Sequence, residues 1–334
     1  MNRELIDRVV KAMLYEGYLL YPYRRSALKN QRRWDFGVLF PEGHGSVIAG
    51  AESSRMQTEC LIVTGTNATL RTRVRFLHLL DCVEIPSATA LQPGRLDVSE
   101  RRGASWQETE EREVDSMEVS VAELASRPRC VRFEFPARHQ DEDVQEGGTG
   151  PACMRRAQER IEGAVDLSVV FVCDGLCKLT AQISNCTPVA ESDGDNRERA
   201  LPRCLISTHT ILEIAGGEFV SVIDPPEGYR DATQACRNAG TWPVLVGAQD
   251  ERDCMLSSPI ILYDYPQVAP ESAGDFFDAT EIDEMLTLRV LTLSDEEKQS
   301  VREGDASARE ILERTESALA EQLMKLHGAL RGLR

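Results

Sequence analysis

The sequence predicts an α+β fold that is mainly an antiparallel β-sandwich or open barrel, with an N-terminal helix and a helical C-terminal section. Short runs rich in β-branched and aromatic residues recur between residues 36 and 223, with turn residues between them. No regular helical pattern separates these runs, and helical patterns are confined to the first 15 residues and the region after residue 280. Consecutive strands without intervening helices favour antiparallel pairing over βαβ units.

The N-terminal segment predicts an amphipathic helix over residues 3–15, which ends before Gly17. Apolar residues recur at helical spacing among charges in this segment: Leu5, Ile6, Val9, Val10 and Met13. A secretory signal would need an unbroken apolar stretch, and no run in the chain reaches the roughly 18 residues of a membrane-spanning helix. We therefore expect a cytoplasmic protein without a membrane span.

The stretch at residues 70–80 predicts a strand with two different faces, as the two-residue period of a half-exposed strand requires. One face carries Leu70, Thr72, Val74, Phe76 and His78. The other face carries Arg71, Arg73, Arg75 and Leu77. The residues TGTN at 64–67 predict a hairpin turn between this strand and the preceding strand at 57–65.

Two more hairpins are predicted further along the chain. The apolar runs at 164–172 and 176–185 are joined by Asp174 and Gly175, and an Asp-Gly pair is a strong hairpin signal. The run at 203–226 indicates another pair of strands that turns at Gly216 and Gly217. Polar, glycine-containing stretches at 139–151 and 190–200 predict surface loops.

The character of the sequence changes after Pro226, which predicts a division into residues 1–226 and 227–334. Short apolar segments at 241–247 and 258–266 come first in the second part. Capping boxes then predict two helix starts, one from Thr280 with Asp283 and one from Ser294 with Glu297. The tail predicts a last helix with one apolar stripe, formed by Ile311, Leu312, Thr315, Leu319, Leu323 and Leu326.

Charge and cysteine content restrict the class of protein. The 334 residues carry a formal net charge of −17, which argues against general binding to DNA or RNA. Ten cysteines are scattered without a CxxC pair, and the nearest two are Cys173 and Cys177. Such cysteines are typically small buried residues in a reducing compartment, so we predict no metal or other cofactor.

One basic and aromatic stretch stands out from this acidic average. The ten residues 24–33 carry five cations and no acid, and five aromatic side chains lie at residues 15–34. Tyr, Trp and Arg are the residue types that often dominate binding energy at protein interfaces. The predicted partner-binding residues are Tyr21, Tyr23, Arg24, Arg25, Lys29, Arg32, Arg33 and Trp34. The alternative is structural, with the aromatic side chains as packing anchors beside a connecting loop.

Catalytic motifs are weak in this sequence. The acid-rich segment at 263–284 includes Asp264, Asp278 and Glu281, which could act as paired carboxylates in a hydrolase. Several of these acids precede a predicted helix, where the helix dipole favours negative charge, and helix capping explains them better than catalysis does. His209 lies in a predicted strand, where a hydrogen-bonded core histidine is the commoner outcome. Neither a nucleophile elbow nor a phosphate-binding loop is present.

Two segments together resemble a known family. They are residues 14–41, LYEGYLLYPYRRSALKNQRRWDFGVLFP, and residues 240–298, which include GTWPVLVG and CMLSSPIILYDYPQVAPESAGDFFDATEIDE. The family comprises uncharacterised proteins encoded in gene clusters for high-affinity, actinobacterial-type nickel–iron uptake hydrogenases. The resemblance carries no known catalytic residue. It implies an accessory, assembly or scaffolding role near the hydrogenase, with a hydrogenase subunit or a maturation factor as the protein partner.

Three hypotheses follow for the function. The first is a non-enzymatic accessory protein that binds a partner through the basic and aromatic stretch. The second is a hydrolase on a β-sandwich that uses paired carboxylates. The third is a metal-handling protein that uses Cys173, Cys177 and a nearby histidine.

Overall fold

The computed structural model describes residues 3–16, 36–86, 105–144, 152–173, 175–189, 196–267, 289–302 and 306–317. By its internal contacts the chain forms two compact units. The first unit comprises residues 1–36, 246–250 and 265–334, and the second comprises residues 37–245 and 251–264. The division predicted after residue 226 follows a change in sequence character, whereas these two units follow contacts within the fold.

The second unit is built around one antiparallel sheet, which confirms the predicted β-rich fold. The strands are β1 (Arg55–Pro86), β2 (Ser105–Asp115), β3 (Val119–Ser120), β4 (Arg129–Phe135), β5 (Arg138–Val144), β6 (Ala152–Gln158), β7 (Ile161–Cys173), β8 (Leu176–Asn185), β9 (Ile206–Phe219), β10 (Trp242–Leu245) and β11 (Cys254–Ser258). The main strand order is β10-β11-β9-β1-β8-β7-β4. The strands β2, β3 and β6 also pair with β1, and β5 pairs with β6.

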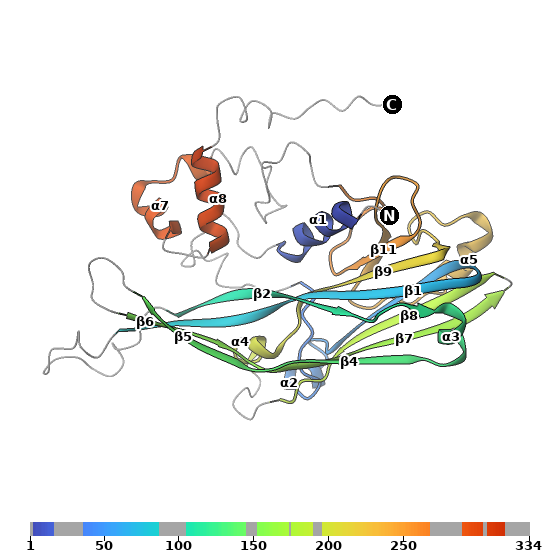
Figure 1. Cartoon of the computed structure of the whole chain (residues 1–334), viewed down its shortest axis with the longest axis horizontal. Helices are drawn as coiled ribbons and strands as arrows, with labels where there is room; N and C mark the ends of the chain where they lie inside the picture. Colours follow the sequence, from blue (N-terminus) through green and yellow to red (C-terminus); the bar gives the residue numbers. More distant parts are fainter. Residues whose placement is uncertain are drawn as a thin grey trace, which may run out of the picture. The chain divides into compact units, whose positions relative to one another are not determined.

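The sheet curls, as Figure 1 shows for β1, β8, β7 and β4. Phe76 of β1 lies 5.9 Å from Phe133 and 5.8 Å from Phe135 of β4, between ring centroids. In a flat sheet these strands would lie about 14 Å apart, because β8 and β7 separate them and neighbouring strands are about 4.8 Å apart. The aromatic core therefore fills the hollow side of the curl. Since all the described strands belong to one sheet, the fold resembles the predicted open barrel, and the predicted sandwich is not confirmed.

A glycine allows one close approach within this core. Gly163 of β7 is the direct cross-strand partner of Phe133 on β4. A Cβ atom at Gly163 would lie 2.2 Å from the Phe133 ring, which is shorter than any real contact. The Phe133 ring therefore covers the glycine, an arrangement that stabilises glycine positions in sheets.

The helices of this second unit are short. They are α2 (Gly45–Ile48), α3 (Val121–Ser126), α4 (Arg197–Ala200), η4 (Leu201–Arg203), η5 (Glu227–Tyr229) and α5 (Arg230–Gln234). The longest of them, α3, has six residues and packs beside β1 and β7. Within the described part of the chain, this agrees with the prediction that no regular helix separates the strands.

The predicted alternation in β1 is confirmed on one face and holds only in part on the other. Leu70, Thr72, Val74, Phe76 and His78 are all buried, as predicted. The opposite face is exposed only in part, because Arg71 and Arg75 are of intermediate exposure whereas Arg73 and Leu77 are only 8% and 1% exposed. The arginines on that face lie in ion pairs, which are described below.

Two predicted hairpin turns are instead the two sides of one bulge. β1 continues through residues 64–67, and β9 continues through Gly216 and Gly217. The pairing shifts between Thr64 opposite Gly217 and Thr69 opposite Ala215, so β1 holds extra residues at this point. Gly216 has φ of +71°, a backbone conformation that glycine adopts at low cost. Glycine thus marks a bulge here, where the sequence pattern indicated turns.

The hairpin between β7 and β8 is confirmed. The two strands pair along most of their length, and the last pair is Cys173 with Leu176. Gly175 has φ of +73°, as expected for the glycine of a tight hairpin turn.

The helices α1 (Arg3–Leu14), α7 (Asp295–Arg302) and α8 (Ala306–Ser317) belong to the first unit. The helix α1 buries Ile6, Val9, Val10, Ala12 and Leu14, in agreement with the predicted amphipathic pattern. Among the described residues, no helix combines the length and the apolar character that a membrane crossing needs.

The predicted capping box before α7 is confirmed. The Ser294 backbone N–H donates to Glu297 Oε2 (3.0 Å), and the Glu297 N–H donates to Ser294 Oγ (3.2 Å). The buried side chains of α8 include Ile311, Leu312 and Thr315 of the predicted stripe. The rest of that stripe and the predicted capping box at Thr280 lie outside the described residues.

Candidate functional site

The predicted partner-binding residues lie outside the part of the chain that the structure describes. Tyr21, Tyr23, Arg24, Arg25, Lys29, Arg32, Arg33 and Trp34 all belong to the interval 17–35. This basic and aromatic stretch therefore stays a prediction. The structure does, however, locate Asp264, Cys173, Cys177 and His209, and it shows two features that the sequence pattern did not reveal.

Asp264, a carboxylate of the hydrolase hypothesis, holds two segments together. Ser221 Oγ donates to Asp264 Oδ2 (2.6 Å), and the Leu245 N–H donates to Asp264 Oδ1 (2.8 Å). Both carboxylate oxygens therefore accept hydrogen bonds within the fold, as in a structural aspartate. Asp278 and Glu281 lie outside the described residues.

The two cysteines of the metal hypothesis lie on neighbouring strands without facing each other. Cys177 is paired with Phe171, and Cys173 with Leu176. Cys177 is buried, and its burial raises the pKa of the thiol, which disfavours the thiolate that binds metals. Among the described residues, no group of three or more His, Cys, Asp or Glu side chains could hold a metal ion.

His209 is a hydrogen-bonded core histidine, as predicted. Its Nδ1–H donates to the Ser207 carbonyl (2.7 Å), so Nε2 is left as an acceptor for the Ser258 hydroxyl at 3.2 Å. Both His209 and Ser258 are fully buried. The pair resembles a serine–histidine dyad in its contacts, but a buried hydroxyl has no access to a substrate. Burial lowers the pKa of His209 to about 4, with the charge of Arg75 acting in the same direction.

We expect His209 to make the protein less stable in mild acid. Its pKa is lowered from 6.5 to about 4 in the fold, so between these values the unfolded chain binds a proton that the folded chain does not. The free energy of unfolding should therefore fall by up to about 1.4 kcal/mol per pH unit as the pH drops from 6.5 towards 4. Urea unfolding at pH 7 and pH 5 measures this loss. The variant His209→Gln should lose less over the same interval, and an equal loss in both proteins would contradict the prediction.

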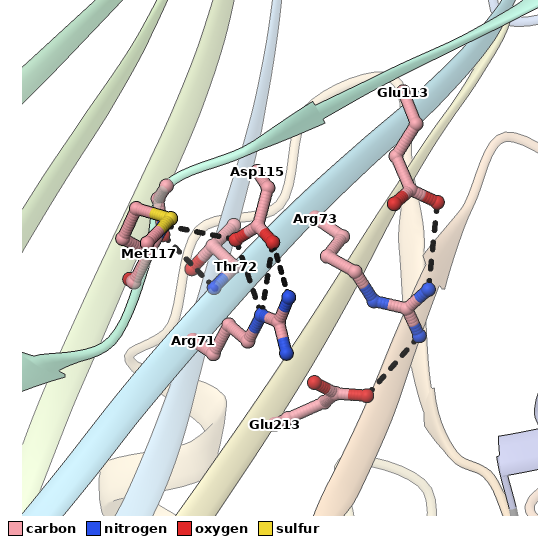
Figure 2. A network of polar contacts seen from close by, with 8 residues as sticks. Arg71, Thr72, Arg73, Glu113, Asp115, Met117 and Glu213 are labelled. Atoms are coloured by element: carbon pink, nitrogen blue, oxygen red, sulfur yellow. Dashed lines mark hydrogen bonds and ion pairs between the residues drawn. The ribbon is translucent and has the colours of Figure 1, made fainter.

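A ladder of ion pairs covers one face of the sheet, where β2, β1 and β9 lie side by side (Figure 2). Arg71 pairs with Asp115 through Nε at 3.0–3.1 Å and through Nη2. Arg75 Nη2 lies 2.7 Å from Glu111 Oε2. Arg75 lies opposite Glu113, so its pair with Glu111 is with the acid two residues beyond its direct cross-strand partner.

The central arginine of this ladder is the most deeply buried. Arg73 lies between two carboxylates, with Nη2 3.1 Å from Glu213 Oε1 and Nη1 3.4 Å from Glu113 Oε2. The side chains of Arg73 and Glu213 are only 9% and 7% exposed. Because these charges are paired within the fold, the ladder fixes strand register, and we assign it no catalytic role.

The end of β7 exposes three consecutive apolar side chains. Val170, Phe171 and Val172 are 58%, 61% and 47% exposed. Successive residues of a strand point to opposite faces, so both faces are open to solvent here. We call residues 168–173 the β7 end segment. Three adjacent large apolar residues in one exposed strand are unusual, and exposed apolar patches often mark protein interaction sites.

The sequence contains signals for both the ladder of ion pairs and the exposed end of β7. The acids at residues 108–115 follow the arginines of β1 in the chain and have the opposite charge. The apolar run at 164–172 was predicted as a strand, and its uninterrupted apolar end is the exposed part. Neither signal alone shows which strands become neighbours.

No protein-family model matches this chain, and no curated protein matches it. The function must therefore be inferred from the residues themselves and from the resemblance given above.

Proposed function

We propose that this chain is a non-enzymatic, cytoplasmic accessory or assembly protein that works by binding another protein. The observation that carries the proposal is the exposed apolar end of β7, with Phe171 at its centre. When a partner removes such side chains from water, the complex is stabilised by roughly 25 cal/mol for each Å² of apolar surface that is buried.

The resemblance to proteins of hydrogenase gene clusters identifies the first partners to test. They are the subunits of a nickel–iron hydrogenase and its maturation factors. The contacts of Asp264, Cys177 and His209 support neither the hydrolase hypothesis nor the metal-handling hypothesis. Each of these side chains forms a hydrogen bond within the fold.

The test is affinity purification of the tagged protein from its native host, followed by mass spectrometry of the bound proteins. We expect a hydrogenase subunit or a maturation factor at a stoichiometric level. A protein that is purified alone, or one that turns over a hydrolase substrate, would contradict the proposal.

The basic and aromatic stretch is tested in the same experiment by reversing its charge. Replacing Arg24, Arg25, Arg32 and Arg33 with glutamate should weaken the complex at least tenfold, because like charges across an interface cost several kcal/mol. A matched control replaces Arg155 and Arg160, which lie in exposed ion pairs of the sheet, and should bind as the original protein does. Unchanged binding in the first variant would show that this stretch is not the contact surface.

A further inference from the structure

The edge of the sheet is open along the β7 end segment. β4 pairs with β7 from Ile161 to Leu167 and goes no further. No described strand pairs with the outer side of residues 168–173, whereas β8 pairs with their inner side. Val169 is buried, with an exposure of 4%, and α3 packs beside β7, so the backbone that is accessible for pairing with another strand lies at the exposed residues 170–173.

The backbone groups that point outward along this edge can be identified. The Cys186 N–H donates to the Glu162 carbonyl (2.9 Å), so the Glu162 backbone faces β8. Backbone direction alternates along an antiparallel ladder, and the pairing with β8 is regular from Gly163 to Phe171. The N–H and C=O groups of Phe171, which is 61% exposed, therefore point away from β8, towards the open edge.

The other open edges carry the features that protect a sheet from unwanted pairing. β2 pairs only with β1 among the described strands, and it carries four glutamates and an aspartate within residues 108–115. β4 exposes Arg132 and Glu134, and the short edge strand β10 contains Pro243. Charges and prolines at edges are the usual protection. Residues 167–173 contain neither a charge nor a proline.

The charges around the segment indicate what kind of strand fits it. Asp166 and Asp174 bracket the uncharged residues in the sequence, and the whole chain carries −17. A strand with an apolar centre and basic residues at both ends would complement this arrangement. A second copy of the chain would bring the same acids and the same net charge, so charge opposes self-pairing.

We propose that the β7 end segment accepts an extended partner segment as an added β-strand, and that this segment has an apolar centre and basic flanks. This inference rests on the proposed function and specifies how the partner is bound. Main-chain hydrogen bonds to the N–H and C=O groups of Phe171 provide the affinity, and the side chains of Val170 and Val172 contribute to the choice of sequence. This is the way many proteins capture extended peptides at a sheet edge.

A pair of substitutions at one position separates backbone pairing from side-chain contact. Phe171→Ala removes the ring and keeps the outward N–H, whereas Phe171→Pro removes both without removing a bond to β8. The probe is a dye-labelled peptide with an alternating valine and threonine core and two lysines at each end. We expect Phe171→Pro to bind it about tenfold more weakly than Phe171→Ala, since a main-chain hydrogen bond is lost. Equal affinities of the two variants would overturn the proposal.

Two further measurements test the partner chemistry and the occupant. A peptide with the same core and glutamate flanks should bind at least tenfold more weakly, and equal binding would overturn the basic-flank assignment.

Hydrogen exchange at the Phe171 amide of the unmodified protein should be fast in the free protein and slow when the lysine-flanked peptide is bound. This measurement does not require the proline variant to fold. Slow exchange in the free protein at low concentration would show that the chain covers this edge itself. Slow exchange that depends on protein concentration would show that a second copy does so. Either result would overturn the proposal.

Failure of this inference can be distinguished from failure of the proposed function. If Phe171→Pro recovers the same partners as the unmodified protein in affinity purification, the chain is an interaction protein that uses another surface. If the unmodified protein recovers no partner, the proposed function itself fails, and the peptide measurement does not depend on that result.

Discussion

Replacing Arg73 with alanine is expected to lower the free energy of unfolding by about 3–5 kcal/mol, because it removes the guanidinium that faces a nearly buried carboxylate. Arg73 Nη2 lies 3.1 Å from Glu213 Oε1, and the two side chains are 9% and 7% exposed. The Glu213 carboxylate would keep its burial and lose that positive charge. Urea unfolding of Arg73→Ala and the original protein measures the difference.

An exposed ion pair of the same sheet provides the matched control. Arg155 and Asp141 lie 2.9 Å apart, with both side chains 51% exposed. Arg155→Ala should change the free energy of unfolding by less than about 1 kcal/mol, as is usual for surface pairs. A double variant, Arg73→Met with Glu213→Leu, should recover most of the stability, since it removes both charges. If Arg73→Ala behaved like Arg155→Ala, Arg73 would not be a buried partner of Glu213.

Replacing Asn185 with alanine is expected to cost about 3 kcal/mol of stability, because three hydrogen bonds of one buried amide are lost together. Asn185 Nδ2 donates to the carbonyls of Leu39 (2.7 Å) and Arg203 (2.9 Å), and its Oδ1 accepts from the Thr187 N–H (3.0 Å). Asn185 is only 1% exposed. The side chain thus joins the end of β8 to two segments that are distant in sequence.

A neighbouring amide on the same strand is the control for this variant. Gln182 of β8 is partly exposed and makes one long hydrogen bond, from Nε2 to Ser184 Oγ at 3.4 Å. Gln182→Ala should therefore change the free energy of unfolding by about 0.5 kcal/mol or less. Similar midpoints of thermal unfolding for Asn185→Ala and Gln182→Ala would argue against the stabilising role of Asn185.

Several local elements of this fold were predictable from the sequence, although the first residues of the loop predicted at 139–151 belong to β5 (Arg138–Val144). The buried face at residues 70–78, the turn at Gly175 and the capping box at Ser294 all depend on residues close together in the chain. Local backbone and side-chain chemistry decides such elements, so the pattern and the structure agree.

The features that involve distant residues were not predictable in the same way. Arg73 was assigned to a half-exposed face because a local pattern contains no information about Glu213, 140 residues further along. Gly216 was assigned to a turn because a bulge requires the same positive φ as a turn. Phe171 is exposed because β4 begins only at Arg129, opposite Leu167, and therefore does not pair with the residues of β7 after Leu167. Nothing within residues 164–172 indicates this.

The long central strand has a consequence for the synthesis of the protein. β1 pairs with five strands, and its partners β8 and β9 lie more than a hundred residues downstream. When residues 55–86 leave the ribosome, those partners have not yet been translated. At about 5–20 residues per second, β9 follows roughly seven to thirty seconds later. During this delay the apolar side chains of the nascent strand can contact other chains and aggregate. The yield of folded protein therefore depends on rapid folding after translation, or on a chaperone that binds the early chain.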